Sequence, residues 1–283
     1  MDTNTLQYRL TESERETFER DGYFIVEDAI SPKVVADLNE ALDAVDAADR
    51  IDREIDPGVT NNILDFIGRD DRFLPLLDLP ETFTKVWDIL GWNIQLYHSH
   101  TIITPPGAPY RTGPRGGLGW HQDSGRLNWE LETNPQPRIS LKVAFFLTDT
   151  TDLGHANLYV VPGSHVNNEL AYASDDAEEP TGAVAVRVKP GTAVFFDRRI
   201  WHASSPNVSD ISRKVLFYGY SYRWLRPRDN MTVEHYFDRC TPIQRQLLGY
   251  APTGKHGYSS PRPEDVPLKA WLEENVGEER VLA

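Results

Sequence analysis

Cysteine is nearly absent from this sequence, with Cys240 the one example among 283 residues. A single thiol cannot form an internal disulfide, and it cannot supply the thiolates that structural zinc sites usually contain. The chain has no apolar run long enough to cross a bilayer and no N-terminal stretch of signal-peptide character. We therefore expect a protein of a reducing compartment, with the cytoplasm as the default location.

Positive charge is also scarce. Lysine and arginine total 29 against 43 aspartate and glutamate residues, which gives a formal net charge of −14 and a pI near 5.0. Nucleic acid and anionic membrane surfaces require a basic face, so we expect neither as a partner. With 40% hydrophobic residues the chain can bury a large core, and we expect one domain over residues 1–283.

Helical patterns lie mainly toward the two ends of the sequence, at 11–20, 31–45, 81–90, 241–248 and 265–275. The acid-rich stretch 46–62 predicts an exposed loop. Short strands are predicted at 23–26, 93–104, 139–147, 157–161, 183–189, 192–197 and 213–222. Because no long helices separate these central strands, the pattern favours an antiparallel sandwich or barrel over βαβ units.

Two segments beside the central strands predict loops. Residues 105–119 are rich in proline and glycine, and residues 124–137 form a second flexible stretch. Loops on a rigid scaffold commonly carry recognition, so both are candidate walls of a substrate site. The candidate contacts are Arg111, Arg115, Arg126 and Trp129, whose arginines could meet a carboxylate or phosphate. Solvated loop charge is an equally good interpretation.

The pattern that points to chemistry is His121-Gln122-Asp123, which follows the glycine-rich loop in what we predict to be a short strand. In an extended segment residues i and i+2 share a face, so His121 and Asp123 can present an imidazole and a carboxylate to one metal ion. His202, where the strand beginning at 192 should end, is the best third ligand. Two histidines and a carboxylate leave coordination positions open, which is typical of non-haem Fe(II) oxygenases.

Arg213 opens the aromatic-rich strand 213–222. Its guanidinium could hold a carboxylate through two parallel hydrogen bonds, although a surface charge at a strand end is the alternative. His98 and His100 also share a face, but Thr104 stands where a cupin-type metal site needs a glutamate. We expect both to be hydrogen-bonded residues near the pocket wall. Structural roles are expected for the other histidines, His155, His165, His235 and His256.

The set His121-x-Asp123, His202 and Arg213, with Pro162-Gly163-Ser164-His165 between them, resembles the phytanoyl-CoA dioxygenase family of Fe(II)- and 2-oxoglutarate-dependent oxygenases, which includes ectoine hydroxylase. The resemblance covers most of the chain. It implies a mainly β fold with added helices, a double-stranded β-helix or jelly-roll sandwich of the cupin type. It also implies Fe(II) bound by the two histidines and the aspartate, and 2-oxoglutarate held by Arg213.

The resemblance implies further that Ser204 assists Arg213 and that Gln122 contacts the co-substrate. The reaction it implies consumes O2 and 2-oxoglutarate, releases succinate and CO2, and hydroxylates an unactivated C–H of a small molecule, such as a secondary metabolite or an amino-acid-like solute. Asp123 occupies the position that related halogenases leave free for chloride. Hydroxylation is therefore favoured over halogenation, while desaturation, epoxidation and ring closure stay open.

One departure concerns the co-substrate: many relatives have a lysine before the Pro-Pro pair, but here Thr104 precedes Pro105-Pro106. Two alternatives come from other classes of protein. A non-catalytic metal-binding jelly-roll sensor would keep the metal ligands but would not need Arg213 and Ser204. A metal-dependent hydrolase would need a general base beside the metal, and the sequence offers no convincing one. The C-terminal region could pack on the barrel or form a dimer contact, so monomer and homodimer both stay open.

Overall fold

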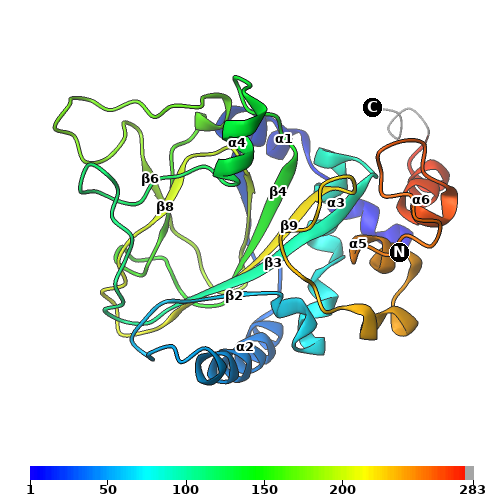
Figure 1. The fold of residues 1–283 in the computed structure, drawn as a ribbon, viewed down its shortest axis with the longest axis horizontal. Coiled ribbons are helices and arrows are strands. Elements are labelled where there is room, and N and C mark those ends of the chain that lie inside the picture. Colours follow the sequence, from blue (N-terminus) through cyan, green and yellow to red (C-terminus); the bar gives the residue numbers. More distant parts are fainter. Residues whose placement is uncertain (278–283) are drawn as a thin grey trace.

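The computed structural model describes residues 1–277, and residues 278–283, which the domain prediction included, lie outside the described part. Two antiparallel sheets form the centre of the molecule, with helices outside the larger one (Figure 1). The larger sheet has the strand order β1-β7-β4-β9-β3-β2, and the smaller has the order β6-β5-β8. The strands are β1 Tyr23–Val26, β2 Asn61–Leu64, β3 Ile94–Thr104, β4 Ser140–Phe146, β5 Leu158–Val160, β6 Val184–Val186, β7 Ala193–Asp197, β8 His202–Ser204 and β9 Arg213–Tyr222.

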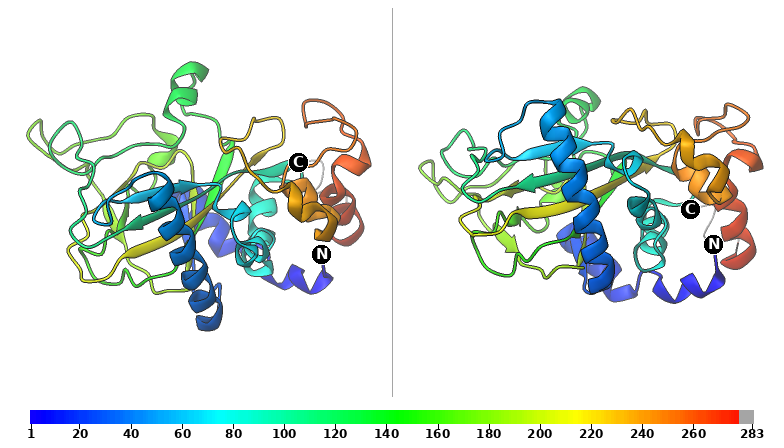
Figure 2. Two further views of the ribbon diagram at one scale, coloured as in Figure 1. Left: turned by 60° about the horizontal axis from the view of Figure 1, so that its bottom comes forward. Right: turned by 90° about the horizontal axis from the view of Figure 1, so that it is seen from below.

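The helices lie at the side and at one end of the larger sheet. The longest, α2, crosses the outer face of this sheet (Figure 2). The α-helices are α1 Glu12–Asp21, α2 Pro32–Asp52, α3 Pro80–Leu90, α4 Gly125–Leu131, α5 Pro242–Leu247 and α6 Pro267–Asn275. Short 3-10 turns cover η1 Thr3–Tyr8, η2 Phe66–Gly68, η3 Asp71–Leu76, η4 Ser164–Val166, η5 Glu234–Arg239 and η6 Pro263–Asp265.

The larger sheet is buried on both faces, and β9 shows how the sequence achieves this. Successive side chains of a strand point to opposite faces. Tyr218 and Tyr220 point toward the helices, where their hydroxyls donate to the carbonyls of Phe73 and Leu77 at 2.6 Å each. Val215 and Phe217 point the other way and pack with residues of the smaller sheet. The inner face of the larger sheet therefore forms one wall of the space between the sheets.

The C-terminal region packs on the end of the sheet. Gln246 of α5 donates from Nε2 to the carbonyls of Trp92 and Ile94, and its Oε1 accepts from the backbone of Leu268 in α6. The side-chain amide thus ties both C-terminal helices to the start of β3. Of the two alternatives for the C-terminal region, the structure shows α5 and α6 packed on the barrel.

The expected exposed loop over 46–62 is wrong at both ends and is confirmed only over residues 53–60. Helix α2 continues to Asp52, and β2 begins at Asn61. The acidic residues that suggested a loop have cationic partners: Asp46 pairs with Arg50, and the buried Asp49 pairs with Arg53. These i,i+4 pairs stabilise the last turns of the helix.

Two further expectations about the central segments are wrong. Residues 124–137 are not irregular throughout, because α4 occupies Gly125–Leu131. The strand starting at 192 does not extend to His202, because β7 ends at Asp197 in the larger sheet and His202 opens β8 in the smaller one. The chain thus crosses from one sheet to the other just before the predicted metal ligand.

Candidate active site

His121 and His202 are brought together by a single β-bridge between segments far apart in the sequence. The backbone N–H of each residue donates to the carbonyl of the other at 3.0 Å. Their imidazole rings lie with centroids 4.3 Å apart. The predicted short strand at His121 is therefore wrong: one residue pair bridges, and Asp123 follows in a turn. The pairing positions the two rings without a longer strand.

Both rings are oriented by backbone carbonyls. Nδ1 of His121 lies 3.0 Å from the carbonyl of Gly119, and Nδ1 of His202 lies 2.9 Å from that of Ile200. A carbonyl only accepts, so each Nδ1 carries the proton and each Nε2 presents a lone pair, as a metal ligand requires. Burial lowers the pKa of His121 and lowers that of His202 to about 3. Both rings are therefore neutral at physiological pH.

Asp123 completes the group, and its backbone N–H donates to the carbonyl of Arg198 at 2.9 Å. Ligand atoms of His121, Asp123 and His202 all lie within 4.8 Å of one another. The carboxylate also meets the buried Lys142 of β4, whose Nζ lies 2.8 Å from Oδ1 and 2.7 Å from Oδ2. Burial raises the pKa of Asp123, but the charge of Lys142 and its hydrogen bond to the carboxylate outweigh it, so the pKa lies well below its usual range. The group is thus an ionised carboxylate between two neutral imidazoles.

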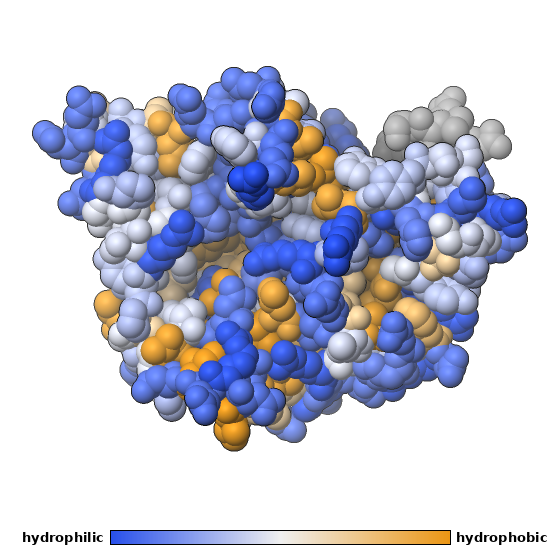
Figure 3. Space-filling view, viewed as in Figure 1, coloured by the Kyte–Doolittle hydropathy of each residue, from blue (hydrophilic) through white to orange (hydrophobic). Residues whose placement is uncertain are grey.

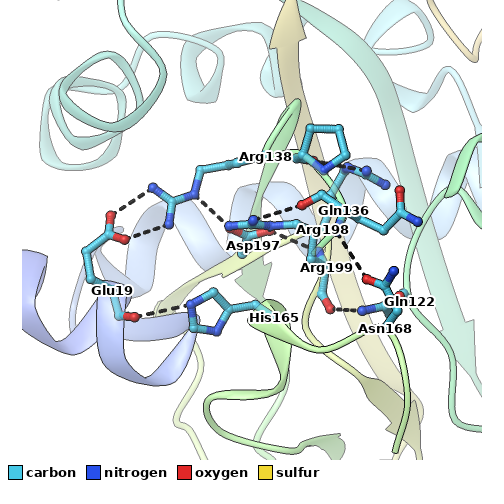
Figure 4. A network of polar contacts seen from close by, with 10 residues as sticks. Glu19, Gln122, Gln136, Arg138, His165, Asn168, Asp197, Arg198 and Arg199 are labelled. Carbon is cyan, nitrogen blue, oxygen red and sulfur yellow. Dashed lines mark hydrogen bonds and ion pairs between the residues drawn. The ribbon is translucent and has the colours of Figure 1, made fainter. Parts of the chain in front are cut away.

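A buried polar network holds the turn that follows β7 (Figure 4). Asp197 is fully buried and accepts from Arg199 Nε at 2.8 Å and from Arg138 Nε at 2.8 Å. Arg138 extends outward to Glu19 of α1, with two hydrogen bonds of 2.8 Å. The network fixes the backbone carbonyls of residues 198 and 199, which accept from Asp123 and from Gln122. The network therefore fixes the position of the metal-ligating segment 121–123.

His165 belongs to the same region but not to the metal group. Its ring is buried, and Nε2 contacts the carbonyl of Glu19 at 3.2 Å (Figure 4). This contact ties η4 to α1. The expected structural role of His165 is confirmed.

Arg213 lies at the start of β9, on the same face as Phe217. Its side chain is buried, with Nε making no hydrogen bond and the guanidinium carbon 5.5 Å from the centre of the Phe146 ring. No carboxylate among the described residues pairs with it, and burial lowers its pKa to about 10. A buried, unpaired guanidinium that lines a cavity is a site for an anion.

Two predicted neighbours of the co-substrate also line the cavity. Ser204 donates from Oγ to the carbonyl of Ala156 at 3.3 Å. Gln122 donates from Nε2 to the carbonyls of Asn167 and Arg199 at 3.1 and 2.5 Å, which leaves Oε1 as the end that can meet a ligand. Their contacts with a co-substrate stay predictions.

A cavity of about 770 Å³ opens in front of the metal group. The face of the molecule that Figure 3 shows is largely hydrophilic and is recessed near its centre. Arg111 and Arg126 line the cavity, as the loop prediction requires. Arg115 and Trp129 do not line it: Arg115 donates to the carbonyl of Asp175 at 2.7 Å, and Trp129 is 71% exposed on α4.

His98 and His100 are not the hydrogen-bonded residues that the sequence predicted. Both ring nitrogens of His98 and Nδ1 of His100 lack a partner among the described residues. His98 fits over Gly219 of β9, and His100 stacks on Phe217 with ring centroids 4.5 Å apart. Packing against the inner face of the sheet, rather than hydrogen bonding, fixes these rings. Of the two, only His100 lines the cavity.

Residues 18–215 match the family described as Phytanoyl-CoA dioxygenase (PhyH). The chain belongs to this family. It is 26% identical over 238 residues to the protein named probable alpha-ketoglutarate-dependent hypophosphite dioxygenase of Stutzerimonas stutzeri, which covers 74% of this chain and 78% of that protein. It is 26% identical over 231 residues to the ectoine dioxygenase of Nocardia farcinica, which covers 71% of this chain and 74% of that protein.

The fold of the phytanoyl-CoA dioxygenase family is also seen in solved structures. HygX from Streptomyces hygroscopicus, with nickel and 2-oxoglutarate bound, superposes with a TM-score of 0.61 at 15% identity, covering 77% of this chain and 90% of that one. The predicted jelly-roll fold is confirmed. With the triad of His121, Asp123 and His202 intact, the predicted enzyme class is confirmed as well: this is an Fe(II)/2-oxoglutarate-dependent dioxygenase.

The residues present fit the cofactor and co-substrate of the family. Two imidazoles with free Nε2 atoms and one ionised carboxylate form the donor set for Fe(II). The unpaired Nε of Arg213 leaves a hydrogen-bond donor for an anion in the same cavity, which suits a dicarboxylate such as 2-oxoglutarate. The alternative of a metal-dependent hydrolase has no support here, because among residues 1–277 the lining of this cavity contains no carboxylate besides the metal ligand Asp123 that could act as a general base.

Sequence reasoning missed three cationic residues of this cavity: Lys142, Arg226 and Arg228. Lys142 carried a signal, since a lysine inside the otherwise apolar strand 139–147 needs a buried partner. The other two follow β9 in a segment with no regular pattern. Among the described residues no helix is long and apolar enough to cross a membrane. Location and oligomeric state stay predictions.

Proposed function

We propose that this enzyme hydroxylates an unactivated C–H bond of a small molecule, such as a secondary metabolite or an amino-acid-like solute, and releases succinate and CO2. The observation that carries the proposal is the shared cavity. It contains the three metal-ligating side chains and the unpaired Arg213, so a metal and a dicarboxylate can be bound side by side. Residues 1–283 act as one catalytic domain in this proposal.

Each residue has a defined task in the proposed reaction. When bound, Fe(II) supplies O2 activation coupled to oxidative decarboxylation of 2-oxoglutarate, and that chemistry oxidises the substrate. His121, Asp123 and His202 hold the metal and leave coordination positions open. Arg213 binds the distal carboxylate of 2-oxoglutarate, with Ser204 beside it and Gln122 contacting the co-substrate through Oε1. Lys142 keeps Asp123 ionised and oriented.

The substrate enters through the recess and rests on the remaining walls of the cavity. Arg111 and Arg126 are the proposed contacts from the loop predictions, and both line the cavity. Arg115 and Trp129 would contact a substrate only through a change in the position of their segments. Desaturation, epoxidation and ring closure use the same site and are the alternative outcomes. A non-catalytic sensor is disfavoured by the buried unpaired Arg213, which a metal-sensing role does not need.

The test is spectroscopic and precedes any knowledge of the substrate. Fe(II) and then 2-oxoglutarate are added to metal-free protein without oxygen, and the weak visible charge-transfer band of the chelate is recorded. We expect the band in the native protein, its loss in His121→Ala and its weakening in Arg213→Ala. His235→Ala and Arg262→Ala, which replace exposed residues of the same types outside the cavity, should keep it. Absence of the band, with tight binding of another metal, would refute the oxygenase assignment.

A further inference from the structure

The charges around the cavity are strongly unbalanced. Its lining includes six cationic side chains and a single carboxylate, Asp123, which is a metal ligand. The chain as a whole has the opposite balance, with a net charge of −14. Charge of one sign that lines a low-dielectric recess concentrates ligands of the opposite sign. The cationic residues are Arg111, Arg126, Lys142, Arg213, Arg226 and Arg228.

Two of these cations, Arg226 and Arg228, have no function in the site described so far, and Arg111 is a proposed substrate contact whose ligand has not been named. Lys142 is paired with Asp123, Arg213 serves the co-substrate in the proposed function, and Arg126 pairs with Glu130 at 2.6 Å. Arg111, Arg226 and Arg228 have no acidic partner among residues 1–277. In contrast, arginines elsewhere on the surface, such as Arg72 and Arg239, form ion pairs. Arginines without an ion pair also occur outside the cavity, such as Arg15 and Arg262, but the cavity brings Arg111, Arg226 and Arg228 together with the unpaired Arg213 in one lining.

The segment with Arg226 and Arg228 is held firmly against the barrel. The backbone N–H of Arg228 donates to the carbonyl of Tyr97 at 2.7 Å. The next residue, Asp229, is buried and accepts from the backbone N–H of Ser99 at 2.6 Å. Both anchors are in β3. The backbone from which the two arginines project is therefore fixed, while their side chains are exposed and can turn toward a ligand in the cavity.

Arg111 reaches the cavity from the other side. Its side chain passes over Gly119, where even a Cβ atom would lie 2.7 Å from Cγ of Arg111. Gly119 also accepts from Nδ1 of His121, so the arginine lies beside the metal-ligating segment. Apolar residues, among them Leu127 and Leu225, lie in the same lining. The cavity thus combines an apolar wall with cations from two separate segments.

We propose that the substrate of this enzyme is an anion: a partly apolar small molecule whose carboxylate or phosphoryl-type oxyanion is bound by Arg226 and Arg228, with Arg111 opposite. The proposal rests on the proposed function for its view of Arg213 as the co-substrate residue. It adds the substrate class and two specificity-determining residues. Oxyanions of both kinds accept forked hydrogen bonds from guanidinium groups, so the shared chemistry is what the cavity selects.

The test uses a matched pair of fluorescent probes with the Fe(II)- and 2-oxoglutarate-loaded protein under anaerobic conditions. The anionic probe is 8-anilinonaphthalene-1-sulfonate, and the neutral probe is N-phenyl-1-naphthylamine, which has the same ring skeleton without the sulfonate. We expect Arg226→Gln/Arg228→Gln to weaken binding of the anionic probe about tenfold, as the loss of two exposed charge contacts implies. The neutral probe should bind this variant and the native protein equally.

Two control variants make the result specific. Arg226→Lys/Arg228→Lys keeps the charge and should retain most of the affinity for the anionic probe, while Arg15→Gln/Arg262→Gln removes the same charge outside the cavity and should retain all of it. Competition with benzoate, phenylphosphonate and benzamide then shows which oxyanion the site prefers. Benzoate and phenylphosphonate should both displace the anionic probe, and the one that does so at the lower concentration identifies the preferred group, carboxylate or phosphonate. The neutral benzamide should not displace it.

Equal binding of the two probes, or an unchanged affinity in the glutamine variant, would overturn the proposal. Displacement by benzamide as effective as by benzoate would overturn it too. The charge-transfer band is recorded on the same samples and reports on the proposed function alone. A normal band with no preference for the anion refutes the substrate class only, whereas a missing band with a clear anion preference refutes the oxygenase and leaves the anion site.

Discussion

Replacing Lys142 with methionine removes the one cation that contacts the metal-ligating carboxylate. The side chains of Lys142 and Asp123 are 5% and 11% exposed, so the pair is buried. Removing one partner of a buried pair leaves an uncompensated charge and costs about 3–5 kcal/mol. The ring centres of Phe196 and Phe217 both lie 5.5 Å from Nζ of Lys142. A methionine at this position can therefore still pack against the two rings, but it has no charge to pair with Asp123. We expect the metal-free Lys142→Met protein to lose about 3 kcal/mol of unfolding free energy.

Urea unfolding of the metal-free proteins measures this loss. With a slope of about 3 kcal/mol per molar urea, the midpoint should fall by about 1 M. A divalent metal replaces the missing cation, so adding Ni(II), which does not change oxidation state in air, should stabilise Lys142→Met more than the native protein and narrow the gap between them. The double variant Lys142→Met/Asp123→Asn lacks the uncompensated charge and should be more stable than Lys142→Met.

The reasoning fails on either of two results. If metal-free Lys142→Met unfolds at the native midpoint, the contact does not compensate a buried charge. If the double variant is as unstable as the single one, removing the charge of Asp123 relieves nothing, and the loss comes from packing around the lysine stem rather than from an uncompensated charge.

Two further predictions concern buried residues. Gly219→Ala should cost about 1–3 kcal/mol in urea unfolding, because a Cβ atom there would overlap the His98 ring; an unchanged midpoint would refute this packing. Burial lowers the pKa of His98 and His100 well below the usual value and that of His202 to about 3, whereas it raises the pKa of Asp229 to about 6. Below about pH 6.5 the unfolded chain therefore binds more protons at these histidines than the folded chain does, and proton uptake by folded Asp229 offsets one of them. The free energy of unfolding should fall from pH 6.5 to 5 by up to about 1.4 kcal/mol per pH unit for each histidine that is not offset. A urea midpoint that stays constant over this range would contradict this prediction.

Local patterns were sufficient for the strands and for the chemistry of the metal group. The aromatic and β-branched residues of 213–222 favour an extended backbone, so the predicted strand is present as β9, with both faces buried. The capping box of Thr11 and Glu14 starts α1 as the sequence indicates. His121, Asp123 and His202 were identified by residue type and spacing, because a metal site needs donors of fixed chemistry.

Elements whose conformation depends on distant partners were predicted poorly. The sequence of the acidic end of α2 resembles that of a loop. In the fold, Arg69 and Asn61 from other segments donate hydrogen bonds to Asp49 and stabilise the helix there. His121 needs no strand, since the backbone of His202 completes its bridge across the fold. His98 was expected to have a hydrogen-bond partner, but the space left by Gly219 decides its position.

The sequence by itself determined the class of enzyme, because donor chemistry and strand periodicity are encoded within short windows. Tertiary structure alone decided which charges share the cavity. Lys142 from β4 meets Asp123, and Arg226 and Arg228 reach the recess because the backbone N–H of Arg228 and the side chain of Asp229 anchor their segment to β3. The physical reason is that electrostatic contacts depend on distance in space, and folding, not sequence separation, sets that distance.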